Sequence, residues 1–166
     1  MTVFSMDGFG IGDDENGIAN AKLLKQALVK NTTLEQLSLG SNLLGSSGLS
    51  NRILSNVMSG IKGSTSLTHV DLSGNEIRRM PSIKLIAKYL ATNPMLIELN
   101  LSSNGMPTKS ACVLMESLKK NTNLEHLSLR NNSITDKCVP AFTDLLQNNT
   151  TLRSLDLGYN KLKVQN

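Results

Sequence analysis

A motif of the form Leu-x-x-Leu-x-Leu-x-x-Asn-x-Leu, called the phrase below, recurs along the sequence and constrains the fold more than any other feature. Its clearest copy runs from Leu124 to Ile134, and Val, Ile or Met replaces Leu at a few places in the copies. The copies start at Leu34, Leu67, Leu96, Leu124 and Leu152, at intervals of 33, 29, 28 and 28 residues. A pattern repeated at this period indicates a repeat protein.

A sixth, degenerate copy opens the sequence. Its five fixed places are taken by Met1, Phe4, Met6, Phe9 and Ile11, so a phenylalanine stands where every other copy has asparagine. The repeat pattern therefore extends over nearly the whole chain.

Each copy predicts a strand, and the residues after it predict a helix. Leu-x-Leu alternates with polar residues at a period of two, which marks a short strand with one buried face. Apolar residues at helical spacing follow, and in the fifth repeat these are Val139, Phe142, Leu145 and Leu146. Alternating strands and helices favour parallel strands joined by right-handed crossovers. Strands lie about 4.8 Å apart and helices about 8 to 10 Å apart, so the stack should curve with the sheet inside.

The phrase and its period resemble those of the leucine-rich repeat family, and a period near 28 with a helical return resembles its ribonuclease-inhibitor-like subclass. The resemblance implies an α/β fold: a right-handed α/β solenoid, or horseshoe, with a parallel β-sheet on the concave face and helices on the convex face. We expect a single leucine-rich repeat domain over 1–166, with repeats starting near residues 1, 34, 67, 96, 124 and 152 and the last incomplete. The extra residues of the two 33-residue repeats are expected at 13–16 and 46–47.

Asparagines occupy two recurring places. One set lies three residues before the phrase, where asparagine in the left-handed conformation is expected to end each helix: Asn31, Asn93, Asn121 and Asn149. The other set lies within the phrase. A buried amide is costly unless its donors and acceptor are all used, and the family resemblance implies a structural ladder of amides bonded to the backbone. The members of this ladder are Asn42, Asn75, Asn104, Asn132 and Asn160. Phe9 cannot continue it, so the first repeat should end the ladder or bend differently.

Side chains that flank the inward leucines are expected to form columns across the concave face. They are almost entirely polar, which suits partly hydrated recognition of another macromolecule. We predict that a partner binds to Gln36, Ser38, His69, Asp71, Ser73, Glu98, Asn100, Ser102, His126, Ser128, Arg130, Ser154, Asp156 and Tyr159.

Both histidines of the chain fall in one column, on either side of Glu98. Three ligands of this kind suit zinc, but strand spacing would place the outer two nearly 10 Å apart at Cα. His126 with Asp156 and Ser128 forms a nominal triad, yet a smooth parallel sheet lacks oxyanion donors and a strained nucleophile turn. We therefore favour a cross-strand ladder of a carboxylate between two imidazoles, with neither a catalytic nor a metal site.

Composition argues against several classes of partner. The net charge is +4 with a pI near 9.2, but the basic residues are scattered over predicted helix faces, and three Phe, two Tyr and no Trp leave little to stack on bases. No apolar run reaches about 18 residues and no signal segment is recognisable, so we expect neither nucleic-acid nor membrane binding.

Cys112 and Cys138 are the only cysteines and are expected to be reduced core residues in a cytoplasmic (intracellular) protein. Three formal glycosylation acceptors, at 31–33, 131–133 and 149–151, point the other way, but such triplets arise readily in an Asn- and Ser-rich repeat.

These observations predict a non-enzymatic protein–protein interaction module without a cofactor, which presents its polar concave face to a protein partner. The alternatives are a regulatory protein resembling leucine-rich-repeat GTPase-activating or actin-capping proteins, or the sensor segment of an immune receptor or microbial effector. Only fold-level analogy supports these alternatives. Both ends lack a polar capping repeat, which predicts either self-association through the ends or a segment of a longer array.

Overall fold

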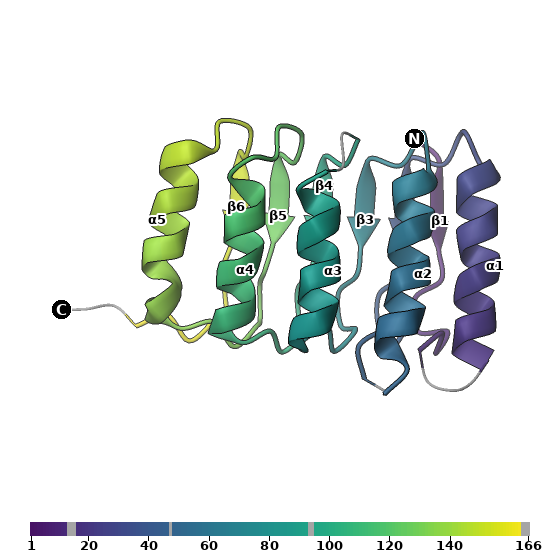
Figure 1. Ribbon diagram of the computed structural model, residues 1–166, viewed down its shortest axis with the longest axis horizontal. Coiled ribbons are helices and arrows are strands. Elements are labelled where there is room, and N and C mark those ends of the chain that lie inside the picture. The colour runs from purple at the N-terminus through teal and green to yellow at the C-terminus, as the bar shows by residue number, and fades with distance from the viewer. Residues whose placement is uncertain (13–15, 47, 93–94, 164–166) are drawn as a thin grey trace.

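The computed structural model describes residues 1–12, 16–46, 48–92 and 95–163, and within these ranges six short parallel strands form one sheet (Figure 1). Each of the first five strands leads into a helix. The strands are β1 (Val3–Ser5), β2 (Gln36–Ser38), β3 (His69–Asp71), β4 (Glu98–Asn100), β5 (His126–Ser128) and β6 (Ser154–Asp156). The helices are α1 (Asn16–Lys30), α2 (Ser50–Gly63), α3 (Met80–Leu90), α4 (Thr108–Leu118) and α5 (Val139–Asn148), with a 3-10 helix, η1 (Asp136–Cys138), before α5.

The strands follow one another across the sheet in sequence order, from β1 to β6. They pair in identical register, so that Leu37, Val70 and Leu99 lie side by side at the same position of the phrase. The helices form one layer over one face of the sheet, and in Figure 1 this row extends beyond the row of strands at both ends. The α/β solenoid predicted from the repeat is confirmed.

The inward leucines form the core between the sheet and the helices. Leu39, Leu72, Leu101 and Leu129 are fully buried, as the alternation of the strands predicted. Burial falls away at both ends of the stack, where Phe4 is 44% exposed and Leu155 is only partly buried. Each strand therefore needs a repeat on either side to bury its inward residue.

The amides of the phrase are bonded to two successive repeats. The Nδ2 of Asn104 donates to the carbonyl oxygens of Leu101 in its own turn and Leu72 in the preceding repeat, each at 3.0 Å. Its Oδ1 accepts the backbone N–H groups of Asn75 and Ile77 in the preceding repeat, again at 3.0 Å. Every amide of this column reaches back in the same way, with contacts at Asn42, Asn75, Asn132 and Asn160. We call these five residues the turn ladder.

The left-handed conformation occurs next to the turn ladder, before each position and also after it at Leu43, Glu76 and Gly105. The prediction that it ends the helices is wrong. The residue before each ladder position, or before Phe9 in the first repeat, has a positive φ of 53° to 72°; these residues are Gly8, Ser41, Gly74, Ser103, Asn131 and Tyr159. By contrast, Asn31, Asn121 and Asn149 do not have positive φ, and Asn149 has a φ of −99°. Asn93 lies outside the described residues.

The asparagines after the helices act through their side chains instead. The Oδ1 of Asn149 accepts the N–H groups of Thr151 at 2.9 Å and Leu152 at 2.7 Å, and its Nδ2 donates to Leu118 O at 2.7 Å. Asn121 repeats this arrangement, Asn31 makes its local part, and the hydroxyl of Ser64 takes the same place in the second repeat. An amide that caps the approach to the next strand explains this second recurring column without a left-handed backbone.

Two predicted features of the helices need correction or comment. Val139 and Leu146, expected on the apolar face of α5, are 48% and 64% exposed, because among the described residues α4 is the helix that packs beside α5. The extra loop residues predicted at 13–16 and 46–47 fall largely outside the described residues. Among the helices in the described ranges, none has both the length and the apolar character needed to cross a bilayer.

Candidate functional site

The face of the sheet opposite the helices carries three columns of side chains, which the sheet register aligns. The first column crosses the strands at their first residue, where Gln36, His69, Glu98 and His126 are successive partners. The second column contains Ser38, Asp71, Asn100, Ser128 and Asp156, and all five are half-buried. The third column, just past the strand ends, includes Ser73, Ser102 and Arg130.

Acceptors in the second column fix the turns that follow them. The Oδ1 of Asp71 accepts the N–H of Ser73 at 2.6 Å, and Asn100 Oδ1 accepts the N–H of Ser102 at 3.0 Å. In the last repeat Asp156 Oδ1 accepts the N–H of the residue two positions on, at 2.8 Å. A short acceptor two residues before a turn amide stabilises the bend, and here it also fixes the direction of the acceptor side chain.

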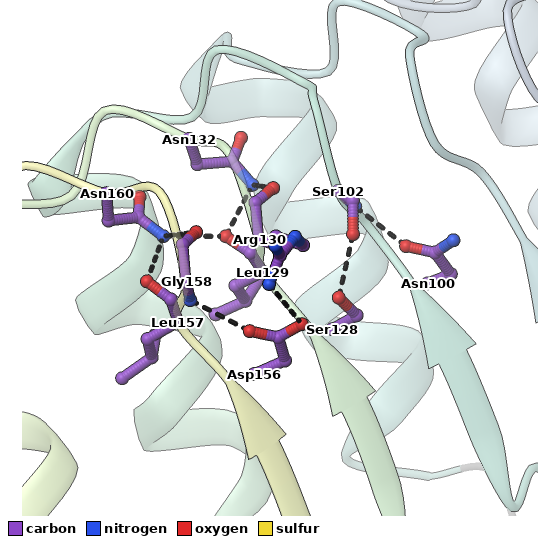
Figure 2. A network of polar contacts seen from close by, with 10 residues as sticks. All are labelled: Asn100, Ser102, Ser128, Leu129, Arg130, Asn132, Asp156, Leu157, Gly158 and Asn160. Carbon is purple, nitrogen blue, oxygen red and sulfur yellow. Dashed lines mark hydrogen bonds and ion pairs between the residues drawn. The ribbon is translucent and has the colours of Figure 1, made fainter.

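Lateral hydrogen bonds join the columns of neighbouring strands. Asn100 Nδ2 donates to Asp71 Oδ2 at 2.9 Å, and the hydroxyls of Ser102 and Ser128 lie 2.7 Å apart. Figure 2 shows Ser102 bonded to both Asn100 and Ser128 at the carboxyl ends of the strands, where the turn ladder residues Asn132 and Asn160 are also drawn. The polar face is therefore ordered by its own contacts.

The last two repeats add an exposed aromatic residue to this face. Arg130 Nη1 lies 3.6 Å from Asp156 Oδ2, and the guanidinium carbon stands 4.2 Å from the centroid of the Tyr159 ring. Glycine at position 158 makes room for this group, since a Cβ there would lie 2.6 Å from Arg130 Nη1. Tyr159 is 75% exposed and stacked on a cation, so it can contact a partner without first being ordered.

The histidine column is formed, and its contacts favour the ladder interpretation only in part. His69 Nε2 lies 3.9 Å from Glu98 Oε2, and its Nδ1 lies 2.8 Å from Thr68 Oγ1. Glu98 and His126 are partners in register, but within the described ranges the ion pair of Glu98 is with His69 alone. A shallow hollow of about 230 Å³ opens here, lined by Val3, Gln36, Leu37, Ser38, His69, Val70, Asp71, Glu98 and Asn100.

Neither chemical alternative at the histidines gains support. In the described part of the chain no three of the His, Cys, Asp and Glu side chains gather as a metal-binding group. In the nominal triad, the Ser128 hydroxyl contacts Ser102 and the Asp156 carboxylate contacts Arg130. A nucleophile needs a base within hydrogen-bond reach, and that base needs an orienting group. The contacts of Ser128 and Asp156 are instead with Ser102 and Arg130, so they do not link the two residues to His126.

Asp7 is a residue of this face that the predicted site left out. Its Oδ1 accepts hydrogen bonds from Ser38 Oγ and the Gly40 N–H, both at 2.6 Å, and its Oδ2 accepts from Ser5 Oγ at 3.0 Å. The hydrogen bond from Ser38 is the largest cause of a lowered pKa for the Asp7 carboxyl, followed by desolvation, which opposes it, and by the Gly40 N–H. In the sequence, Asp7 falls in the same column as Ser73, Ser102 and Arg130, and this position could have added it to the predicted binding residues.

The two faces of the solenoid differ in charge. The sheet face carries the carboxylates of Asp7, Asp71, Glu98 and Asp156, with Arg130 as the cation placed among them. The helices α1, α2 and α3 contain no acidic residue; their basic residues are Lys22, Lys25, Lys30, Arg52, Lys62, Lys84 and Lys88. The overall charge of +4 therefore reflects the helix side and not the predicted binding face.

Comparisons with known proteins agree with this architecture. None of the curated proteins matches the sequence significantly. Among solved structures, the chain is similar to "Leiomodin-1 Actin-Binding Site 2 (ABS2)", with a TM-score of 0.70 and 22% identity over 81% of this chain and 77% of that one. It has a weaker likeness to the TLR13–ssRNA13 complex, with a TM-score of 0.46 and 19% identity over 81% of this chain and 20% of that one.

Sequence profiles of the leucine-rich repeat supply the family. One profile matches 123–145, and a second matches 30–51, 63–78, 92–107 and 148–163. Together these segments cover more than half of the chain and coincide with five of the six phrases. With the sheet, the helix layer and the turn ladder, they show that this chain belongs to the leucine-rich repeat family.

Proposed function

We propose that this chain is a non-enzymatic protein–protein interaction module whose polar sheet face binds a protein partner. The observation that carries the proposal is the network of bonds among the sheet-face side chains. Asp71, Asn100, Ser102, Ser128 and Asp156 are all held by neighbours within the face. Side chains that are already ordered lose little conformational freedom on binding, so more of the contact energy remains as affinity.

The contact surface in this proposal is the predicted set from Gln36 to Tyr159. Glu98 and Tyr159 are its most exposed large members, with the Glu98 side chain 50% exposed and Tyr159 75% exposed. An exposed carboxylate and a stacked aromatic ring can dominate such an interface, because a few anchors carry most of the binding energy.

The test compares two sets of exposed substitutions in otherwise intact protein. One variant combines Glu98→Ala, His126→Ala and Tyr159→Ala on the sheet face, and its control combines Lys84→Ala and Lys88→Ala on α3. Proteins captured by the wild type are quantified with each variant, and the dissociation constant of each purified partner is then measured. We expect the sheet-face variant to weaken binding by about tenfold or more and the α3 variant to change it little. Partners lost with the α3 variant and retained with the sheet-face variant would refute the proposal.

Actin is a defined first protein to assay, because the leiomodin-1 structure with the same fold is described as an actin-binding site. Co-sedimentation with filaments, and fluorescence anisotropy with monomers, would measure binding directly. At 22% identity the likeness concerns the fold, so actin enters as one candidate partner beside the regulatory and receptor-like alternatives.

The subclass, domain and compartment belong to the same proposal. Repeats of 28 and 29 residues with a full α-helix in each return support the ribonuclease-inhibitor-like subclass. A continuous six-stranded sheet through the described residues supports a single domain over 1–166. Two free cysteines support a cytoplasmic protein. That it binds no cofactor, nucleic acid or membrane is part of the proposal.

The amino-terminal end of the stack supports self-association as a further part of the proposal. Phe4, Met6, Phe9, Ile11 and Leu23 line an apolar hollow of about 430 Å³ between β1 and α1. This surface continues the packing that each interior repeat makes with its neighbour, so a second copy of the chain is a suitable cover. Light scattering should show a mass that rises with concentration, and Phe9→Ser with Leu23→Ser should abolish the rise. A matched Lys84→Ser variant on α3, away from both ends of the stack, should leave it unchanged; a strictly monomeric wild type would exclude self-association.

A further inference from the structure

The cysteines of two neighbouring repeats meet on the helix side of the solenoid. Cys112 lies in α4 and Cys138 ends η1, and their Sγ atoms are 2.8 Å apart. Both are free thiols. A disulfide needs its sulfurs at about 2.0 Å, so little movement separates the pair from bonding distance.

We propose that Cys112 and Cys138 form a modification site, which a hydroperoxide converts into a disulfide that joins the fourth and fifth repeats. The contact between the sulfurs carries this proposal, and it involves no residue of the sheet face. A zinc site is a poorer use of the pair, because structural zinc takes four ligands and the described residues bring no third ligand to these thiols.

Unequal burial gives the two thiols different roles. Cys138 is fully buried, whereas Cys112 is partly exposed, so a small oxidant reaches Cys112 first. Burial raises the pKa of the Cys138 thiol, with a smaller effect from the hydrogen bond to Cys112, so Cys138 reacts slowly with an oxidant in solution and reacts instead with the sulfur of Cys112 that it already contacts. Cys112 is therefore the attacking residue and Cys138 the resolving residue.

The reaction balances in two steps. The sulfur of Cys112 attacks one peroxide oxygen, the O–O bond breaks, and the thiol becomes a sulfenic acid while water leaves for hydrogen peroxide. The sulfur of Cys138 then attacks the sulfur of Cys112, the S–O bond breaks, and the hydroxyl leaves with the Cys138 proton as a second water. In sum, two thiols lose two protons and two electrons to one peroxide, which is reduced to two waters when it is hydrogen peroxide.

The new bond would close a loop that contains the whole of β5 and its turn. Closing such a loop restricts the unfolded chain and stabilises the fold, and we expect the melting temperature to rise by roughly 5 to 10 °C. The bond also fastens α4 to η1.

The experiment uses the full chain, reduced and then freed of reductant, and treated with hydrogen peroxide. Thiol titration under denaturing conditions should fall from two thiols to none, and non-reducing peptide mapping should join the Cys112 and Cys138 peptides within one chain. Dithiothreitol should restore both thiols and the lower melting temperature. Wild-type protein that keeps both thiols, or that joins cysteines only between chains, would overturn the proposal.

Serine variants test the assigned roles. Cys138→Ser should stop at the sulfenic acid of Cys112, which dimedone traps, whereas Cys112→Ser should give no dimedone adduct. The reverse pattern would overturn the assignment of attacking and resolving residues. If a variant does not fold, the rate of thiol loss and the peptide map of the wild type still decide whether the bond forms.

Discussion

The first and fourth repeats place different residues at the same position of the phrase. In the fourth repeat this residue is Asn104, which is 1% exposed and bonded to the preceding repeat through its donor and its acceptor. In the first repeat it is Phe9, which is 72% exposed. The amide serves the turn of the repeat before it, and within the described residues no turn lies before Phe9. A position that is indispensable inside the stack is therefore permissive at its first repeat.

The first repeat has an additional tie to the second. Beside the buried amide of Asn42, which reaches back to Met6 and Ile11, Asp7 bonds the hydroxyl of Ser38 and the N–H of Gly40 across the open face. An exposed carboxylate is sensitive to acid and salt, whereas a buried amide is not. The two repeats should therefore respond differently to substitution and to pH.

The largest effect is expected from Asn104→Ala. This substitution removes an acceptor for two backbone N–H groups and a donor to buried carbonyl oxygens. Unsatisfied buried groups are costly, so the free energy of unfolding should fall by about 3 to 5 kcal/mol. Urea denaturation measures it, with Phe9→Ala as the matched change in the first repeat. Equal losses for the two variants would contradict the comparison.

Truncating the equivalent inward residue of the same two repeats should give a smaller difference in the loss of unfolding free energy. Leu101 is fully buried, so Leu101→Ala should lower the free energy of unfolding by about 3 kcal/mol. Met6, at the equivalent position of the first repeat, is only partly buried, and Met6→Ala should cost roughly 1 kcal/mol. The same urea titration applies, and a Met6→Ala loss as large as that of Leu101→Ala would show that the first repeat is packed as tightly as the fourth.

The asparagines after the helices should give a smaller difference. Asn149 both accepts two local N–H groups and donates to Leu118 O, whereas exposed Asn31 is a local acceptor. Asn149→Ala should therefore cost about 1 to 2 kcal/mol and Asn31→Ala about 0.5 kcal/mol. Thermal melts of both variants would check the order, and the reverse order would argue that the cross-repeat bond contributes nothing.

The smallest effect is expected from pH at Asp7. Its folded-state pKa is lowered, so its contribution to stability is present above the unfolded pKa and is lost as pH falls through the folded one. Wild type should be more stable than Asp7→Asn near neutral pH, and the difference should shrink below about pH 4. Urea midpoints of both proteins across this range provide the measurement. A difference that stays constant into acid would show that the Asp7 charge is not involved.

Local rules explain how much of the fold could be predicted. The period-two alternation placed every strand, because burying one face of a strand requires that pattern. The left-handed residues were missed at Ser41 and Ser103, since serine carries no special preference for positive φ. Asn149 was assigned to that conformation because asparagine tolerates it, but an amide can instead bond the next strand through its side chain.

The candidate site was predictable as a surface but not as a set of contacts. The register of the strands predicts which side chains share a column. The directions of the Asp71, Asn100 and Ser102 side chains depend on their hydrogen-bond partners, which the sequence does not specify. Asp7 shares the third column with Ser73 and Arg130 and could have been included, but its bonds to the second repeat span more than thirty positions of sequence and could not be foreseen. Val139 and Leu146 are exposed because, within the described residues, a helix packs on one side of α5 alone, and the spacing of apolar residues does not show how many neighbours a helix has.

The backward reach of the turn ladder gives the molecule a polarity that its regular appearance conceals. A substitution at one asparagine removes hydrogen bonds from the turn of the preceding repeat, since the amide of Asn132 accepts the N–H of Asn104 and that of Asn104 accepts the N–H of Asn75. Local opening should therefore increase on the amino-terminal side of the substituted residue, while the turns on its carboxyl-terminal side stay closed.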